Sequence, residues 1–350
     1  MPCTIVVGGQ YGSEGKGKTV ALTAARLDEP WVVRCGGPNS GHTVTIRGTE
    51  RVLRQVPAAA DHPRAMLLLS AGCAVDEDVL LDEVDALGLS KERVIVDSRA
   101  ILITAEDKQR EAALVDDIAS TGTGTGSALA RRMLRRNVLL ASDSQRLKDR
   151  VRVEHVAPLL HKALDADHDV IVEGTQGFGL SLLHGTHYPF VTSRDTTASG
   201  FAMEVGLSPR QIDDVIMVIR TFPIRVGGNS GPLEDEISWE EVQHISRAPD
   251  IQPEYTSVTR RLRRVARFNM EMVKLACMYN RPTSIALMGL DRLDSTNAEL
   301  KEWVSLSQKA MSFIDYVEGE TGIIVSLAGT GFHTVAAVLA EKGLRSVTRC

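Results

Sequence analysis

The chain has 350 residues, 43% hydrophobic and 24% charged, which is an ordinary globular composition, and its formal net charge is -5. The negative balance argues against non-specific nucleic-acid binding, which needs a basic surface, and no apolar run is long enough to span a membrane. Five cysteines stand far apart without a C-x-x-C pair, so we expect reduced thiols in a soluble cytoplasmic protein rather than a disulfide framework or a zinc site.

Short apolar runs alternate with helical patterns along the chain. Strands are expected, in chain order, at 4–8, 31–35, 65–70, 94–97, 169–174, 214–220, 284–289 and 322–327. Helices are expected at 19–27, 105–118, 153–164, 239–245, 266–279 and 333–342, and a hairpin at 43–56 with its turn near Gly48 and Thr49. This alternation predicts an α/β fold, a largely parallel sheet covered by helices on both faces, in one domain spanning 1–350.

The first expected strand runs directly into a phosphate-binding pattern. The segment fits G-x-x-x-x-G-K-[ST] with the residues Gly12, Ser13, Glu14, Gly15, Lys16, Gly17, Lys18 and Thr19. Backbone N–H groups in such a turn, together with the N-terminus of the helix that follows, form an anion site. The strand–loop–helix context therefore predicts that this loop binds phosphate.

Two further glycine-rich loops carry polar side chains. The loop at 36–43 follows the second expected strand and contributes Asn39, Ser40 and His42. The loop at 120–127 alternates hydroxyls with glycines and leads into a basic helix, where hydroxyl and N–H groups at the helix start favour a phosphate. Taken singly, each is equally typical of a glycine-rich turn, followed in the second case by a solvated basic helix.

Two later segments suit a nucleobase and a carboxylate. Gln176 follows the strand at 169–174, and its amide can both donate to and accept from a purine edge. The run at 256–264 places Arg260, Arg261, Arg263 and Arg264 within five positions, and arginine binds carboxylates and phosphates bidentately. An ordinary strand-to-helix turn and a solvated helix face are the alternatives for these two segments.

The five motifs together resemble one enzyme family. The order QYGSEGKGK, GGPNSGHT, STGTGTG, EGTQG with HGTHYPFVTS, and VTRRLRR is similar to that of the adenylosuccinate synthetases over roughly residues 4 to 334. The resemblance implies a homodimer with a twisted, mainly parallel sheet and a C–N ligase that couples L-aspartate to a 6-oxopurine nucleotide. It also implies Mg²⁺ and a nucleoside triphosphate, whose γ-phosphate moves to the purine O6 before the aspartate amine displaces it.

Position by position, the resemblance assigns site residues. Ser13, Lys16, His42 and Gln176 would be catalytic, and the donor nucleotide would contact the phosphate loop, Asp291 and Gly329. Magnesium would be held by Ser13 and the carbonyl of Gly41. The purine nucleotide would contact Asn39, Ser40, Thr121, Arg135, Gln176, Thr192 and Arg261, with Arg135 reaching across the dimer interface and Arg131 a rival for that role. The aspartate would contact Thr256, Ser257, Val258, Thr259, Arg261 and Arg263.

Three positions depart from the family pattern. The first loop of the family reads Gly-Asp-Glu-Gly-Lys-Gly, with Asp as the base toward the purine N1 proton and as a magnesium ligand, but this chain has Ser13. A neutral hydroxyl cannot replace a carboxylate base and is a poor metal ligand. Pro38 stands where the family usually has His, and Gly289 stands where its donor-base loop has Lys, two residues before Asp291.

Three explanations of Ser13 compete. The chain could be an inactive paralogue, an ordinary adenylosuccinate synthetase with a relocated base, or an enzyme whose substrate differs beside N1. Guanine carries an amino group on C2, next to N1, and a short serine leaves room for it and can accept its hydrogen bond. Ser13 and the compact length resemble the viral branch of the family, which uses dGMP in 2-aminoadenine deoxynucleotide synthesis, with the host cytoplasm as its location.

We therefore expect dGMP, L-aspartate and ATP as the ligands, with GTP as the alternative donor. An ordinary synthetase acting on IMP and GTP is the second hypothesis. A P-loop kinase or GTPase switch would share the first loop but would not need the arginine-rich segment at 256–264, and a non-catalytic nucleotide sensor would bind without consuming aspartate.

Overall fold

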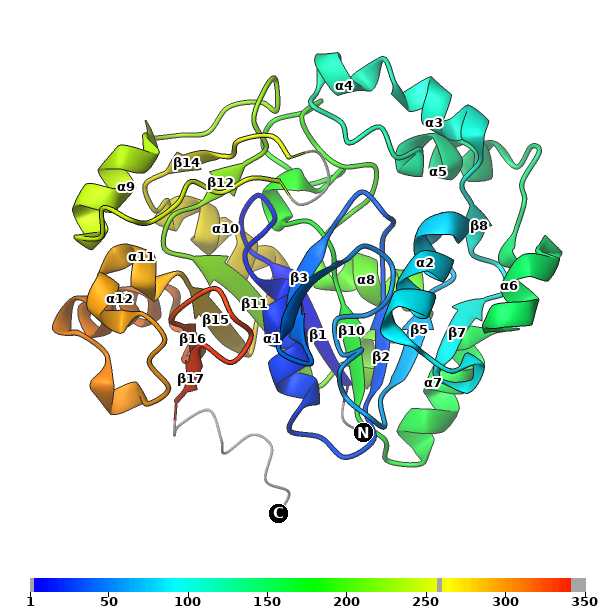
Figure 1. The fold of residues 1–350 in the computed structure, drawn as a ribbon, viewed down its shortest axis with the longest axis horizontal. Coiled ribbons are helices and arrows are strands. Elements are labelled where there is room, and N and C mark those ends of the chain that lie inside the picture. Colours follow the sequence, from blue (N-terminus) through cyan, green and yellow to red (C-terminus); the bar gives the residue numbers. More distant parts are fainter. Residues whose placement is uncertain (1–2, 257–259, 341–350) are drawn as a thin grey trace.

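The computed structural model describes residues 3–256 and 260–340. A ten-stranded sheet forms its centre, and all neighbouring strands in it run parallel except the pair at one edge, β16 and β17 (Figure 1). In spatial order the strands are β17 (Ala337–Leu339), β16 (Val325–Gly329), β15 (Ser284–Met288), β11 (Asp214–Arg220), β1 (Cys3–Gly8), β10 (Val170–Glu173), β2 (Trp31–Arg34), β5 (Met66–Leu69), β7 (Val94–Asp97) and β9 (Arg152–Glu154).

Both faces of this sheet are buried, as the continuous apolar strands predict. Along β1, Cys3, Ile5 and Val7 pack into one hydrophobic cluster, whereas Val6 packs into the cluster on the opposite face. The first cluster is covered by α7 (Val156–Asp165), α8 (Ala198–Val205), α10 (Met270–Asn280) and α12 (Gln308–Thr321). The second is covered by α1 (Lys16–Ala24), α2 (Glu77–Leu87) and α6 (Gln145–Arg150). The expected α/β architecture is confirmed.

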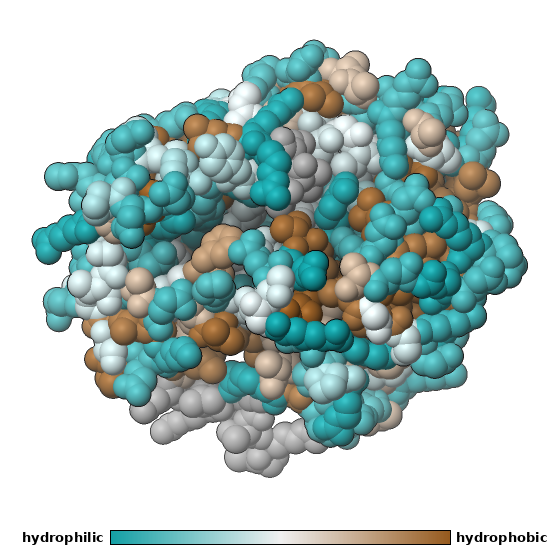
Figure 2. Space-filling model, in the orientation of Figure 1, coloured by the Kyte–Doolittle hydropathy of each residue, from teal (hydrophilic) through white to brown (hydrophobic). Residues whose placement is uncertain are grey.

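Smaller elements gather beyond the carboxyl ends of the central strands. They are α3 (Ala105–Glu111), α4 (Leu114–Asp117), α5 (Thr125–Leu134), α9 (Trp239–Ser246), α11 (Leu290–Leu293) and a sheet of β12 (Ile224–Arg225), β14 (Arg264–Ala266) and β13 (Glu236–Ile237). The hairpin of β3 (His42–Ile46) and β4 (Thr49–Leu53) projects in front of β1, and β6 (Ala74–Val75) pairs with β8 (Ile101–Leu102) (Figure 1). On the face shown in Figure 2, hydrophilic side chains predominate and apolar ones are scattered among them.

The expected strands and the hairpin are all present, but several helices differ. The pattern at 105–118 is divided into α3 and α4, and the helices expected from 153 and 266 begin only at Val156 and Met270, because strands β9 and β14 occupy the residues before them. The helix expected at 333–342 is wrong for the described residues, which continue to 340. There, Ala337–Leu339 pairs antiparallel with β16, whose edge is otherwise open. An alanine- and valine-rich run is compatible with a helix or a strand, and here pairing with the open edge of β16 favours the strand.

Candidate active site

A cavity of about 520 Å³ lies where β1, β11 and β15 end. Open parallel sheets bind ligands at this edge. The lining combines segments that are far apart in the sequence, namely Ser13–Lys18, Gly41–Thr43, Arg220, Gln252–Tyr255, Arg260, Arg263, Met288, Gly289, Asp291, Arg292, Gly331 and Phe332. Four of the five sequence motifs therefore lie at or directly beside one cavity, as the following contacts show.

Glu14 holds the phosphate loop in shape. Its Oε1 accepts the backbone N–H groups of Gln10 (3.1 Å) and Gly12 (2.7 Å), and its Oε2 lies 2.5 Å from Nζ of Lys16. The loop needs left-handed backbone at Gly12, Ser13 and Gly15 (φ 87°, 55° and 109°). The buried Glu14 carboxylate is thus fully engaged, while the side chain of Ser13 is exposed at the cavity.

Lys18 joins helix α1 to the loop before β17. Its Nζ donates to the carbonyl oxygens of Gly331 (2.9 Å) and Ala336, and burial lowers its pKa to about 8. Thr19 is also buried, and its hydroxyl donates to the carbonyl of Gly15 at 3.2 Å. In this structure the two residues that close the phosphate motif bind backbone carbonyls.

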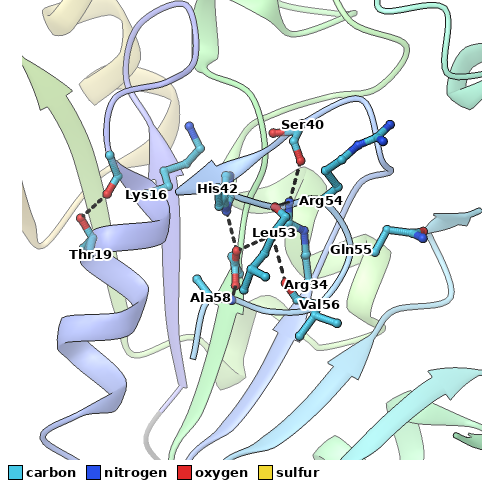
Figure 3. Close-up of polar contacts among 12 residues, drawn as sticks. Lys16, Thr19, Arg34, Ser40, His42, Leu53, Arg54, Gln55, Val56 and Ala58 are labelled. Atoms are coloured by element: carbon cyan, nitrogen blue, oxygen red, sulfur yellow. Dashed lines mark hydrogen bonds and ion pairs between the residues drawn. The ribbon is translucent and has the colours of Figure 1, made fainter. Parts of the chain in front are cut away.

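His42 is part of a buried polar network at the start of β3 (Figure 3). Its Nδ1 lies 2.5 Å from Oε1 of Glu173, the last residue of β10, and the same oxygen accepts from Nη1 of Arg34 at 2.9 Å. Arg34 ends β2 and is the direct register partner of Glu173 in the sheet. Burial, together with the Arg34 charge, lowers the pKa of His42 to about 4. The Nε2 atom of His42 is buried and has no hydrogen-bond partner within the described residues.

A second ion pair forms the opposite wall of the cavity. Arg220 ends β11, and its Nη2 lies 2.5 Å from Oε1 of Glu254, while its Nη1 donates to the carbonyl of Ser13 at 3.2 Å. Burial alone would raise the pKa of Glu254, but the guanidinium of Arg220 lowers it to about 2. Glu254 is therefore a charged partner for arginine and a poor base.

The expected aspartate segment is only partly described. Ser257, Val258 and Thr259 lie outside the described residues. Thr256 is buried, and its hydroxyl accepts the N–H of Arg261 at 2.9 Å. Arg263 lines the cavity and its Nε donates to the carbonyl of Tyr255 at 3.2 Å, whereas Arg261 lies outside the lining.

None of the expected purine contacts lines this cavity. The backbone of Gln176 packs within 3.7 Å of a Cβ built on Gly12, which places the fourth motif against the phosphate loop. Thr125 lies 2.7 Å from a Cβ built on Gly37, so the second and third loops are also adjacent. Asn39, Ser40, Thr121 and Thr192 are all partly exposed, as ligand contacts require.

One part of the third-loop prediction is wrong. The backbone N–H groups at the start of α5 are already hydrogen-bonded within the protein. The buried carboxylate of Glu111 accepts hydrogen bonds from the N–H groups of Gly124 (2.6 Å), Gly126 and Ser127 (3.1 Å). The hydroxyl of Thr121 remains partly exposed and lies 3.2 Å from that of Thr123. The partly exposed hydroxyl of Thr121 is thus better placed for a ligand than the three N–H groups that Glu111 occupies.

The two candidate interface arginines, at the end of α5, have different environments. Arg131 is buried, and its Nη2 lies 2.8 Å from Oδ2 of Asp107 and 2.8 Å from the carbonyl of Leu102. Arg135 ends the helix with left-handed backbone (φ 55°) and an exposed side chain. Arg131 is thus held within its own protomer, whereas Arg135 is free to reach outward.

Of the donor-side residues, Asp291 lines the cavity and Gly329 packs against the lining residue Met288. Asp291 follows β15. Burial raises the pKa of Asp291, although the charge of Arg292, whose Nε lies 3.7 Å from the Asp291 carboxylate, acts to lower it. Gly329 ends β16, where a Cβ would lie 2.4 Å from Sδ of Met288, itself a lining residue. Within the described residues, no group of three His, Cys, Asp or Glu side chains is placed to hold a metal ion.

Sequence reasoning gave no role to Arg34, Glu173 or Arg220, although Glu173 opens the fourth motif. Each is the charged last residue of a strand whose preceding three residues are apolar, β2, β10 and β11 respectively. Because parallel strands end at the same edge of a sheet, this pattern was a usable signal for the site. What the sequence could not supply was the strand order that makes Arg34 and Glu173 neighbours.

Comparison with known proteins agrees with this geometry. The family model of adenylosuccinate synthetase matches residues 5–152 and 139–301. The adenylosuccinate synthetase of Methanocaldococcus jannaschii is 42% identical over 338 residues, covering 95% of this chain and 94% of that protein. The Pyrococcus horikoshii enzyme is 40% identical over 338 residues, covering 95% of this chain and 96% of that protein. No helix in the described residues is long and apolar enough to cross a membrane.

Two solved structures share the fold. The fully ligated adenylosuccinate synthetase of Plasmodium falciparum superposes with a TM-score of 0.85 at 17% identity, covering 97% of this chain and 99% of that one. The succinoaminodeoxyadenylate synthetase of cyanophage S-2L, solved with dGMP and with dATP as an energy donor, superposes with a TM-score of 0.80 at 28% identity, covering 99% and 97%.

Proposed function

Because the chain belongs to the adenylosuccinate synthetase family, C–N ligases that join L-aspartate to a purine nucleotide by using a nucleoside triphosphate, we propose that its own substrates are dGMP, L-aspartate and ATP. The products would be 2-amino-2′-deoxyadenylosuccinate, ADP and phosphate. The observation that carries this proposal is Ser13, an uncharged side chain exposed at the cavity.

The surroundings of Ser13 favour a substrate that differs beside N1. Both neighbouring carboxylates already have partners. Glu14 binds Lys16 and two backbone N–H groups, and Glu254 binds Arg220. Neither is therefore available as a base at the position where the family has Asp. A serine there leaves space for the C2 amine of guanine, and its oxygen accepts a hydrogen bond from that amine. Hypoxanthine has no C2 amine, so the replacement of Asp by Ser at position 13 adds no hydrogen bond to it.

The relatives support two different substrates. The cyanophage S-2L enzyme was solved with dGMP, which favours our proposal, and with dATP as its donor, which favours ATP here. Gly289, in place of a lysine beside Asp291, also removes part of the site for a guanine donor. The archaeal relatives at 39–42% identity carry the ordinary name, so IMP with GTP is the second candidate.

The reaction would proceed in two steps within this cavity. First, the N1 proton would pass to solvent through a water beside Ser13 while the purine O6 attacks the γ-phosphorus, and the bond to the β–γ bridging oxygen breaks to release ADP; Lys16 and the N–H groups of the loop stabilise the charge in transfer. Second, the aspartate amine attacks C6, the C6–O6 bond breaks, phosphate leaves with O6, and the amine proton passes to solvent. His42 would contact O6, and Gln176, beside Gly12, would hold the base in register.

Mg²⁺ is the cation that the family uses, and the donors here fit it only together with the nucleotide. Ser13 and the carbonyl of Gly41 are the proposed protein ligands, and both line the cavity. They are neutral oxygens, and Mg²⁺ is commonly bound by few protein groups together with substrate phosphates. Its contribution would be to neutralise charge that develops on the transferred phosphoryl group.

The remaining contacts complete the assignment. Asn39, Ser40, Thr121 and Thr192 would bind the purine nucleotide, and the segment Thr256–Thr259 with Arg261 and Arg263 would bind aspartate. We propose a homodimer in which Arg135 of one protomer reaches the nucleotide phosphate of its partner. The exposed side chains of Met133 (81%) and Leu134 (70%), directly before Arg135, favour burial of this helix end against a second copy.

The substitution Ser13→Asp tests the substrate assignment. Aspartate tolerates the left-handed backbone at this position, so the loop should keep its shape. We expect kcat/KM for dGMP to fall at least about tenfold relative to IMP, about 1.4 kcal/mol of transition-state stabilisation. Ser13→Ala keeps the space and removes the acceptor, so it separates the two effects. An unchanged dGMP-to-IMP ratio in Ser13→Asp would show that this position does not select the base.

A further inference from the structure

Glu173 holds His42 from one side through a carboxylate that is itself immobilised. The side chain of Glu173 is 0% exposed. Its Oε1 faces both Nδ1 of His42 and Nη1 of Arg34, and its Oε2 accepts the N–H of Ala58 at 2.7 Å. Arg34 is anchored in turn, because its Nη2 donates to the carbonyl of Ser40 at 2.7 Å. The position of this carboxylate is therefore set by two strands and the loop after β4.

Gly17 holds His42 from the other side. A Cβ built on Gly17 would lie 2.7 Å from Cβ and 3.4 Å from Cα of His42, so the first turn of α1 packs directly against the histidine. Between Gly17 and Glu173 the imidazole has little freedom to turn. Its Nε2 atom, buried and without a partner in the described part of the chain, is the atom left for the cavity that His42 lines.

We propose that Glu173 is the positioning residue for His42: by accepting the Nδ1 hydrogen bond it selects the tautomer with the proton on Nδ1 and directs Nε2 to the substrate O6 region. A carboxylate accepts but does not donate, so the nitrogen that faces it must carry the hydrogen. In the neutral ring Nε2 then holds the lone pair, so it donates to O6 only in the doubly protonated ring, in which both nitrogens are donors. Carboxylate–histidine pairs set ring orientation in this way in other enzymes.

The inference deepens the proposed function, since it concerns how the same site aligns the phosphoryl-transfer step. It does not depend on which purine is used, because dGMP and IMP share the 6-oxo group that His42 would face. Failure of the dGMP assignment would therefore leave it intact, and kinetics can be measured with whichever nucleotide is turned over.

The variant Glu173→Gln tests the role kinetically. An amide cannot accept hydrogen bonds at all three contacts, because one of its two ends is a donor. We expect kcat to fall at least about tenfold while KM for each substrate stays within about threefold. In a His42→Asn background, the same change should lower kcat by less than about twofold, because Glu173 acts through His42. An equal loss in both backgrounds would overturn the proposal.

A control and a spectroscopic readout separate positioning from a general loss of stability. Asp97 is a matched control, a fully buried carboxylate at the end of β7 that accepts from Arg99 and from the N–H of Val156 and lies outside the cavity lining. Asp97→Asn should leave kcat within about twofold. The ¹⁵N spectrum of the full-length protein, with His42 assigned by comparison with His42→Asn, should show Nδ1 protonated and Nε2 bare, and a mixture of tautomers in Glu173→Gln. A parent protein with Nε2 protonated and Nδ1 bare would overturn the proposal without any kinetic measurement.

Discussion

Arg131 lies in the last turn of α5 and Arg135 directly follows that helix, and exchanging each for alanine should have opposite consequences. Arg131 is 9% exposed and pairs with Asp107, which is 1% exposed. Arg131→Ala leaves that carboxylate buried without its cation, and breaking a buried pair in this way costs about 3–5 kcal/mol. The side chain of Arg135 is exposed. Arg135→Ala is therefore a surface substitution and should change the free energy of unfolding by no more than about 0.5 kcal/mol.

Thermal unfolding and steady-state kinetics together check this pair. At about 2 °C per kcal/mol for a chain of this size, Arg131→Ala should lower the Tm by roughly 6–10 °C, and Arg135→Ala by less than about 1 °C. Arg135→Ala should instead raise KM for the purine nucleotide at least about tenfold, because an arginine–phosphate contact is charge-assisted and bidentate.

Mixing variants shows whether Arg135 acts in the partner's site. In a heterodimer of Arg135→Ala with His42→Asn, one of the two sites combines an intact His42 with an intact Arg135 from the other protomer. With the purine nucleotide held well below the KM of Arg135→Ala, both preparations are weakly active, and statistical exchange should then raise the activity toward a quarter of the parent value, as two-fold symmetry requires. No recovery after verified exchange, or a Tm loss in Arg135→Ala equal to that of Arg131→Ala, would refute the reasoning.

Two further substitutions test contacts that shape the site. Gly17→Ala places a methyl 2.7 Å from Cβ of His42, so kcat should fall at least about tenfold. Gly319→Ala in α12 is the control, because a Cβ there meets nothing within 4 Å. It should stabilise the protein by up to about 1 kcal/mol in a denaturant titration and leave kcat unchanged. Equal kcat values for Gly17→Ala and Gly319→Ala would contradict the packing argument. Glu111→Gln removes an acceptor from the N–H groups at the start of α5, so isothermal titration should show weaker purine-nucleotide binding together with a stability loss of about 1–3 kcal/mol. Unchanged affinity for the nucleotide would show that the loop at 120–127 is not part of its site.

The fold and the phosphate loop could be predicted because their signals are local. Each central strand is a continuous apolar run, and the loop from Gly12 to Thr19 has a fixed spacing between a strand and a helix. The network of Arg34, Glu173 and His42 could not be predicted, because it depends on the position of β10 between β1 and β2. No local sequence pattern reveals that strand order.

The same limit explains the errors. Glu111 occupies N–H groups that the sequence offered to a phosphate, through a contact between α3 and α5 that only the packed structure defines. Arg131 and Arg135 look equivalent in the sequence, yet one forms a buried ion pair and the other has an exposed side chain. Residues whose roles rest on such tertiary contacts were missed or left open.

The central claim, a ligase that uses dGMP and ATP, is tested most directly by aspartate-dependent phosphate release. The purified protein would be assayed with ATP or GTP against dGMP, GMP, IMP and dIMP, each with and without L-aspartate. Our account predicts the highest kcat/KM for dGMP with ATP, and no product without aspartate. A preference for IMP with GTP would establish the ordinary synthetase instead, and the absence of aspartate-dependent turnover with every purine would contradict the assigned reaction itself.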